Sequence, residues 1–344
     1  MSRPVRMKDI ARDLKVSIVT VSKVLRNHDD ISPATRQRVL QRVQELNYQP
    51  NWAARSLVTQ RTYMVGMVIP DLMISFFAEV SKGVAAKLAP LGYHVAISNS
   101  EEDPEVEKQE IERLLARQMD GLIIASAQRH PDRKLFDSLE TRKIPYVLID
   151  RTLPGLRSNY VGVRDEEIGS LATEHLIEQG CRRIAHIRGP MLSTGTGRLK
   201  GYRRVLAHHG LEVSARYVVN GGWRDDTGYL AMRELLKLDP RPDGVFCYND
   251  AVAAGAIKAI LEGGLKVPDD VAIIGAANVH YSDLLRVPLS TVDQSSMLIG
   301  EKAAELLVRL IEAKTPPAPE RILIPPRLVV RESSTRILKL RPLD

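Results

Sequence analysis

The stretch VSIVTVSKVL, residues 16–25, decides how the N-terminal segment folds. Six of its ten residues are β-branched, and propensity alone would predict a strand. A strand, however, would place Lys23 on the same face as Val21 and Leu25, which makes that face a poor one to bury. At the helical period, Val21, Val24 and Leu25 form one apolar stripe. The stretch therefore predicts a helix with one buried face.

Two further helices are expected around this one. In MKDIARDLK (7–15), Ile10, Ala11 and Leu14 share a helical face. Ser17 is placed to cap the helix that follows, and Ser32-Pro33 is a start signal for the next. In that third helix the residues expected to face inward are Val39, Leu40, Val43 and Leu46. Three short helices with a tight turn between the first two predict a helix-turn-helix unit.

The positive charge of the chain is concentrated in this segment. The whole sequence of 344 residues carries a formal charge of +7, and residues 1–61 alone hold 12 Lys and Arg against 5 Asp and Glu. The rest of the chain is therefore electrically balanced. A basic stretch is often only a solvated surface or a tail, but one that also folds favours a nucleic-acid partner.

The outward face of the middle helix suits the major groove of DNA. Serine and lysine side chains reach phosphates or base edges, and Ile18 and Val19 can pack on thymine methyl groups. The alternative is that Ile18 and Val19 pack against another part of the protein. The predicted DNA contacts in this region are Ser17, Ile18, Val19, Thr20, Ser22, Lys23 and Arg26.

The segment YQPNWAARSLVTQRT (48–62) follows. Asn51 can cap a short helix, but a helix this short is not stable alone in water. Folding upon binding DNA would account for it. Leu57, on a helix with Arg55, suits a minor-groove wedge that unstacks a base step. We predict that Asn51, Ala54, Arg55 and Leu57 contact DNA.

Residues 7–57 strongly resemble the lactose/galactose repressor (LacI/GalR) family of bacterial transcription regulators. The resemblance implies that residues 17–26 are the recognition helix and residues 51–58 a hinge helix. It also implies that Leu57 inserts at the centre of a palindromic double-stranded DNA operator, bound by a homodimer. The expected function is a transcriptional regulator of the repressor type, whose DNA affinity a small molecule controls.

From residue 63 onward, apolar strands alternate with helices in two series. This rhythm predicts parallel sheets covered on both faces, and its length favours two doubly wound lobes with a ligand cleft at the carboxyl ends of the strands. The expected fold is an all-α helix-turn-helix head followed by an α/β core. The predicted boundaries are 1–50 for the head, 51–61 for the hinge, 62–344 for the core, about 62–162 and 291–320 for the first lobe, and about 163–290 and 321–344 for the second.

Polar residues at the predicted strand ends are candidate ligand contacts: Asp71, Ser126, Asp150, Asn249 and Asp250. The loop GPMLSTGTGR (189–198) holds Gly195 and Gly197, with Gly201 one residue too late for the dinucleotide fingerprint. It is therefore weak support for nucleotide binding, and its glycines can instead serve a turn. Arg198, expected in the first turn of the next helix, can fork onto vicinal hydroxyls or a carboxylate.

The core resembles the same family over residues 62–335, and the family core is built like periplasmic sugar-binding proteins. The resemblance makes Phe77 and Trp223 stacking residues, although the plain reading of these aromatics is that they belong to the core. It implies polar contacts from Asp150, Arg198, Asn249 and Gln294, and also from Asp71, Ser126 and Thr194. The sequence departs from the family at GAAN, where Ala276 and Ala277 replace an aromatic residue and Asp. A bulkier or less polar effector than a typical monosaccharide is one consequence.

Other classes of protein fit less well. The sequence has no G-x-S-x-G elbow, no cysteine beside a histidine and no zinc-like spacing, so we expect neither an enzyme nor a metal or cofactor. A transport-type binding protein would need a signal peptide and no basic head. With no apolar run of membrane-spanning length, a cytoplasmic, nucleoid-associated protein is expected. Both effector-induced release and effector-promoted binding of DNA remain open.

Overall fold

The computed structural model describes residues 5–25, 28–48 and 61–336, which form two separate units, an N-terminal head up to Thr62 and a core from Tyr63. Among these residues, no helix has the length and apolar character needed to cross a membrane. The head consists of α1 (Met7–Leu14), α2 (Ile18–Leu25) and α3 (Pro33–Glu45). The prediction of a helix over the β-branched stretch is confirmed.

Local signals account for the helix ends of the head. Lys15 has a left-handed backbone (φ 53°) and closes α1, so the chain turns at once into α2. Ser17 Oγ accepts a hydrogen bond from Thr20 N at 3.0 Å, and Ser32 Oγ accepts one from Thr35 N at 3.3 Å. Both predicted caps are therefore present. The buried residues of the head are Ile10, Ala11, Val21, Val24, Val39 and Tyr48.

One predicted core residue of the head is wrong. Leu40 is 44% exposed, whereas Val39 is fully buried, and Val43 and Leu46 pack at the edge of the cluster. Because α3 is covered on one side only, its buried stripe is narrower than the run of apolar residues suggested.

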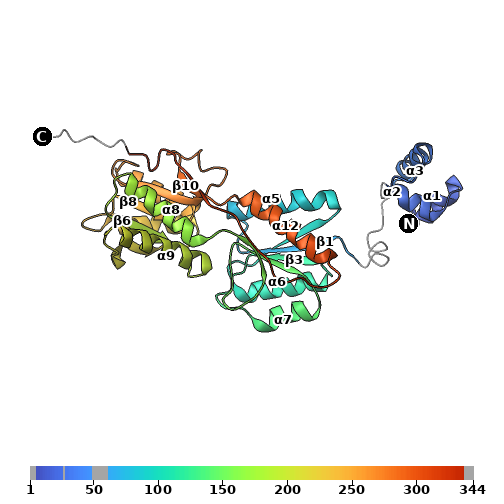
Figure 1. Ribbon diagram of the computed structural model, residues 1–344. Helices are drawn as coiled ribbons and strands as arrows, with labels where there is room; N and C mark the ends of the chain where they lie inside the picture. Colours follow the sequence, from blue (N-terminus) through green and yellow to red (C-terminus); the bar gives the residue numbers. More distant parts are fainter. Residues whose placement is uncertain (1–4, 26–27, 49–60, 337–344) are drawn as a thin grey trace. The chain divides into compact units, whose positions relative to one another are not determined.

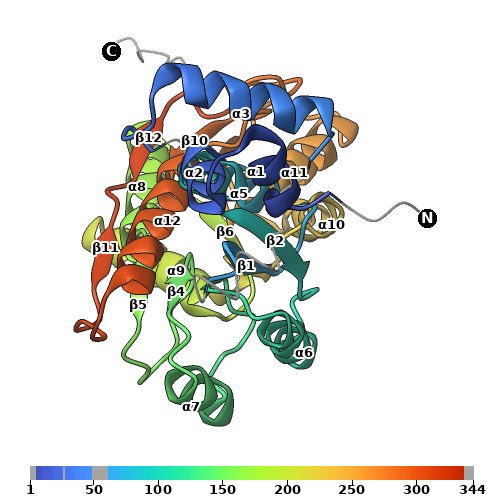
Figure 2. The same ribbon diagram turned by 90° about the vertical axis from the view of Figure 1, so that its right-hand side faces the viewer.

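The core contains two six-stranded sheets. The first has the order β11-β5-β4-β3-β1-β2, and Figure 2 shows it from β11 and β5 at one edge to β2 at the other. Every neighbouring pair in it is parallel. Its strands are β1 (Met64–Ile69), β2 (His94–Asn99), β3 (Gly121–Ile124), β4 (Tyr146–Ile149), β5 (Asn159–Gly162) and β11 (Arg321–Leu323).

Helices cover both faces of the first sheet. On one face lie α5 (Ser75–Leu88) and α12 (Ser296–Glu312), and on the other α6 (Pro104–Ala116) and α7 (Arg133–Thr141), as Figure 1 shows. The 3₁₀ helix η1 (Ala89–Leu91) extends α5 and ends at Gly92, whose φ of 77° is the left-handed conformation that glycine adopts freely. These elements make up the first lobe.

The second sheet has the order β12-β10-β9-β8-β6-β7, and only β10 and β12 pair antiparallel. Helices α8 and α9 pack together on one side, and α10 and α11 on the other. The strands are β6 (Ile184–Arg188), β7 (Val218–Asn220), β8 (Gly244–Cys247), β9 (Ala272–Ala277), β10 (Ser290–Asp293) and β12 (Arg327–Val329). The helices are α8 (Asp165–Glu178), α9 (Ser193–His208), η2 (Ala215–Tyr217), α10 (Asp225–Leu236) and α11 (Asp250–Glu262). They form the second lobe.

The chain crosses between the lobes after β5, after β10 and after β11. The predicted lobe boundaries at residues 290 and 320 therefore lie a few residues before the observed crossings, because β10 ends at Asp293 and β11 at Leu323. β10 still pairs with β9 of the second lobe, and β11 pairs with β5 of the first. β11 is the edge strand of its sheet, whereas β10 lies between β9 and the edge strand β12. The sequence pattern showed no sign of which sheet either short strand joins.

The predicted loop at 189–198 is also wrong in part. Helix α9 begins at Ser193, so Gly195 and Gly197 are helical, and Arg198 lies in the second turn. A Cβ atom on Gly201 would lie 2.1 Å from the backbone oxygen of Glu166 in α8. The glycines of this segment therefore serve close packing of α9, not a phosphate-binding turn.

Candidate functional site

The outer face of α2 carries apolar side chains in contact with solvent. Ile18 is 50% exposed and Val19 is 61% exposed, whereas Val21 and Val24 are buried against α1 and α3. Neither exposed residue packs into the described head, so the alternative of burial within the head does not hold. An exposed apolar pair on a short helix with one buried face is able to contact thymine methyl groups in the major groove.

Polar residues flank this apolar pair. Ser17 caps α2, and its hydroxyl lies 2.8 Å from the Thr20 hydroxyl. Lys23 forms an ion pair with Asp30, and this hydrogen bond lowers the pKa of the Asp30 carboxyl. Ser22 is half-buried on the same helix. Five predicted DNA contacts lie outside the described residues: Arg26, Asn51, Ala54, Arg55 and Leu57.

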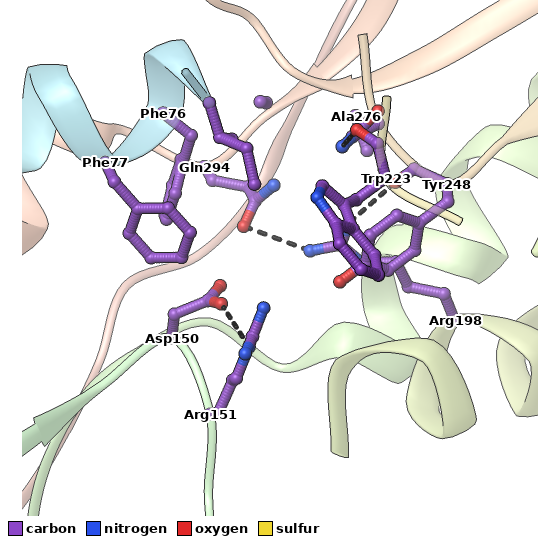
Figure 3. A pocket seen from close by; sticks show the side chains of 12 residues that line it. Phe76, Phe77, Asp150, Arg151, Arg198, Trp223, Tyr248, Ala276 and Gln294 are labelled. Atoms are coloured by element: carbon purple, nitrogen blue, oxygen red, sulfur yellow. Dashed lines mark hydrogen bonds and ion pairs between the residues drawn. The ribbon is translucent and has the colours of Figure 1, made fainter. Parts of the chain in front are cut away.

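The core holds a pocket between its two lobes. It encloses about 350 Å³ of space free of atoms, part of it open to solvent. Its walls come from the carboxyl ends of strands in both sheets and from the inter-lobe crossing after β10, as expected for facing doubly wound lobes. The lining residues are Ile74, Phe76, Phe77, Asp150, Arg151, Arg198, Trp223, Tyr248, Asn249, Ala276, Ala277 and Gln294 (Figure 3).

Arg198 lies deep in this pocket, with 2% of its surface exposed. Its Nε donates to Asp165 Oδ1 at 3.0 Å and its Nη1 to the Tyr248 backbone oxygen at 2.6 Å. A third, longer bond runs from Nη2 to Gln294 Oε1 at 3.3 Å. Burial raises the pKa of Asp165 to about 6, and the guanidinium of Arg198 offsets part of that cost. The planar fork is therefore fixed in place before any ligand arrives.

A second arginine lies beside the carboxylate at the end of β4. Asp150 has a left-handed backbone (φ 60°) and is 7% exposed, and burial raises the pKa of its carboxyl. Its Oδ2 lies 3.4 Å from Arg151 Nε. Arg151 in turn donates to both carboxylate oxygens of Glu102, at 2.8 and 2.6 Å, and is held rigidly.

Two aromatic rings lie on opposite sides of the cavity, Phe77 from α5 and Trp223 from the segment before α10 (Figure 3). The Trp223 indole donates to Asp71 Oδ2 at 3.4 Å, a contact between the lobes. Asn249 fixes the Trp223 backbone by donating to its oxygen at 2.9 Å, while its own side-chain oxygen caps α11. The rings form two walls of a slot.

The structure brings six of the predicted effector contacts into the lining: Phe77, Asp150, Arg198, Trp223, Asn249 and Gln294. Asp71 lies outside the lining and reaches it through Trp223. The other three predicted contacts, Ser126, Thr194 and Asp250, are buried behind the lining and bonded to the protein. Ser126 donates to Glu107, Thr194 pairs with the Tyr248 hydroxyl, and Asp250 accepts from two hydroxyls and an amide.

The sequence reasoning missed Ile74, Phe76, Arg151 and Tyr248 as lining residues. Tyr248 had a signal, because it directly follows β8, where ligand contacts are expected, whereas Arg151 lies one residue further on, after Asp150. The Tyr248 ring also lies under the Arg198 guanidinium, 4.6 Å from its carbon atom. Ile74 and Phe76 look like ordinary core residues of a helix start.

Comparison with known proteins identifies both parts of the chain. Residues 6–51 match "Bacterial regulatory proteins, lacI family", and residues 173–334 match "Periplasmic binding protein-like domain". The ribose operon repressor of Halalkalibacterium halodurans is 36% identical over 95% of this chain and 96% of its own length. The chain belongs to the lacI family of bacterial regulatory proteins. A second relative, the transcriptional repressor PurR of Mannheimia succiniciproducens, is 34% identical over 96% of this chain and 99% of its own length.

Solved structures agree with this membership. A lac repressor dimer bound to operator and the anti-inducer ONPF has a TM-score of 0.83 at 26% identity, covering 97% of this chain and all of that one. The regulator CelR in complex with cellobiose has a TM-score of 0.72 at 33% identity, covering 96% of this chain and all of that one. This lacI-family protein is thus a DNA-binding transcriptional regulator, with a repressor-type head and an effector-binding core, and not an enzyme.

Proposed function

We propose that this protein represses transcription by binding a palindromic operator as a homodimer, and that a neutral, sugar-like effector in the inter-lobe pocket controls its DNA affinity. It acts in the cytoplasm, at the nucleoid. The observation that carries the effector proposal is the buried carboxylate of Asp150, which faces the cavity between two aromatic rings.

The head supports the DNA half of the proposal. Helix α2 presents Ile18 and Val19 to solvent beside Ser17 and Lys23, on a segment that holds the whole net charge of the chain. In a homodimer, two such helices read half-sites about 34–36 Å apart, one turn of the duplex. Arg26 and the hinge residues Asn51, Ala54, Arg55 and Leu57 are proposed to add contacts on either side.

Asp150 supports a hydroxylated ligand. Among the described residues, its carboxylate contacts Arg151 Nε and receives no hydrogen bond from a backbone amide or a hydroxyl. An ionised carboxylate accepts up to about four hydrogen bonds. Ligand hydroxyls that donate to Asp150 would fill the free acceptor positions of its carboxylate. Arg198 and Gln294 would then bind oxygens on another edge of the ligand. The rings of Phe77 and Trp223 suit the two apolar faces of a sugar ring.

The charge balance favours a neutral ligand. Asp150, Asp165 and Glu102 supply three carboxylates, and only Arg151 and Arg198 supply cations among them. An anionic effector would add a further negative charge to a buried site that already has an excess carboxylate, which is costly in a medium of low dielectric constant. Neutral sugars carry no such penalty. The cellobiose bound to CelR, a relative similar over nearly the whole chain, is consistent with this class.

A thermal-shift screen tests the proposal. The full chain is heated with neutral mono- and disaccharides, with sugar acids and sugar phosphates, and with nucleobases. We expect stabilisation by a neutral sugar, which Asp150→Asn weakens at least tenfold in apparent affinity. Stabilisation by a sugar acid, a sugar phosphate or a nucleobase, with none by neutral sugars, would contradict the proposed effector class.

A further inference from the structure

The pocket is divided by chemistry into two ends. Asp150 and Arg151 lie at one end, and Ala276 lies at the other, beyond the Trp223 ring (Figure 3). Arg198 and Gln294, which are hydrogen-bonded to each other, complete the polar side. The carboxyl end of β9, by contrast, contributes only the methyl groups of Ala276 and Ala277. Ile74 and Phe76 also line the pocket, and Phe76 lies beside Phe77, away from Ala276 (Figure 3).

Two further polar side chains of the lining, those of Asn249 and Tyr248, already have hydrogen-bond partners within the protein. Asn249 Oδ1 accepts from Val252 N at 2.8 Å, and its Nδ2 donates to the Trp223 oxygen at 2.9 Å. The Tyr248 hydroxyl is paired with Thr194 at 2.8 Å. A ligand hydroxyl directed towards the alanine end would therefore lose its water and find few side-chain partners, which weakens binding about tenfold or more.

The alanine end is also held rigidly. Ala277 has a φ of 147° and Asn278 one of 57°, conformations that persist only where the surroundings impose them. Behind them, the buried Asp250 accepts from Val279 N at 3.0 Å, Ser282 Oγ at 2.7 Å and Thr291 Oγ1 at 2.6 Å. These bonds tie the segment after β9 to α11 and β10. The apolar surface thus does not rearrange easily to offer a polar group.

We propose that the effector is an amphiphilic neutral sugar, a deoxy sugar or a glycoside, whose methyl, alkyl or aryl group lies against Ala276 and Ala277. The inference rests on the proposed function and narrows its ligand class. Hydroxyls on the opposite edge of the same sugar contact Asp150, Arg198 and Gln294. An apolar group at the alanine end gains from burial, where a hydroxyl would be left without partners.

Pairs of sugars that differ at one position test this proposal. The full chain is titrated calorimetrically with D-galactose and D-fucose, with D-glucose and 6-deoxy-D-glucose, and with free glucose, methyl β-glucoside and phenyl β-glucoside. We expect the deoxy sugar or the glycoside to bind at least about tenfold more tightly than the parent sugar of its series. Parent sugars that bind as tightly or more tightly would overturn the inference while leaving the proposed function intact. Failure of every neutral sugar in the panel and in the thermal-shift screen would overturn both.

A second experiment places a charged side chain at the alanine end of the pocket. Ala277→Asp adds acceptors where the pocket has none and should shift the preference towards the hydroxylated sugar by about tenfold. Ala207→Asp, the same change at an exposed position of α9, should leave the preference unaltered. Should Ala277→Asp fail to fold, Ala276→Ser at the neighbouring position should shift the preference in the same direction. An unchanged ratio of affinities in the folded variants would overturn the inference.

Discussion

The head and the core of this protein place their side chains in opposite ways. In the head, apolar Ile18 and Val19 face solvent on α2 of a segment carrying net positive charge. In the core, charged Asp150 and Arg198 are more than nine-tenths buried in a pocket. Each inversion of the usual rule, apolar inside and charged outside, marks a surface whose natural contact is another molecule.

The difference also concerns preorganisation. The guanidinium groups of Arg151 and Arg198 in the pocket are each held by two or more hydrogen bonds before a ligand binds. In the head, Lys23 has an exposed ion pair with Asp30, which water and salt weaken. A rigid pocket suits discrimination between similar small molecules. The weak, exposed ion pair of the head allows Lys23 to leave Asp30 and bind a DNA phosphate instead.

The largest expected effect comes from removing the buried cation of the core. Arg198→Ala leaves Asp165 without its ion-pair partner, and we expect the core to lose about 3–5 kcal/mol of stability. Because the head is a separate unit, its unfolding should be unchanged. Urea unfolding monitored by tryptophan fluorescence, in a Trp52→Phe background that leaves Trp223 as the fluorophore, and by circular dichroism measures this difference. Arg204→Ala, an exposed arginine on the same helix, serves as the control and should cost below about 1 kcal/mol. Equal losses in the two variants would contradict the account of the pocket.

Two substitutions in α2 separate its faces. Val21→Ala removes a fully buried side chain and should cost the head about 2 kcal/mol of stability. Ile18→Ala, at a half-exposed position, should change stability by no more than about 0.5 kcal/mol but reduce operator affinity roughly tenfold. Thermal unfolding and gel-shift titration measure the two quantities. A loss of folding in Ile18→Ala with unchanged DNA affinity would reverse the assignment of the faces.

The core should also be sensitive to acid. Burial lowers the pKa of His186 to about 3, with its ring stacked on Phe246, and burial lowers the pKa of His175 as well. Their folded-state pKa values lie below the ordinary 6.5, so the unfolded state binds more protons, and stability is lost as pH falls below about 6.5. For His186 alone, we expect a loss of about 2 kcal/mol between pH 7 and pH 5. Urea unfolding of wild type and of His186→Phe at both pH values measures it. The variant should show a smaller loss, and an identical loss would exclude His186 as a cause.

The smallest effect concerns Lys23. If it exchanges Asp30 for a phosphate, Lys23→Ala should lower the slope of log affinity against log salt by about one. Asp30→Asn removes the competing carboxylate and should leave the slope unchanged while raising affinity. Gel-shift titrations at several salt concentrations measure both variants. A changed base preference with an unaltered slope in Lys23→Ala would make Lys23 a base contact.

The sequence predicted the elements well but only part of the pocket, for physical reasons. Apolar periodicity and caps such as Ser17 and Ser32 are local, so the helices of the head were found. The pocket depends on long-range partners that no local pattern shows. Ser126 lies at a strand end, as predicted, yet the buried Glu107 from α6 binds its hydroxyl. Arg151 was missed because the left-handed backbone of Asp150 ends the alternation of the strand and allows neighbouring side chains to line one cavity.

The most direct test of the central claim is the affinity of the full chain for DNA with and without its ligand. A palindromic site is first selected from random duplexes, and the Kd is then measured with and without the sugar that gives the largest thermal shift. The account predicts a change of about 5- to 150-fold, and a loss of this change in Arg198→Ala that Arg204→Ala does not show. A sugar that saturates the core and leaves the Kd for the selected site unchanged would contradict it.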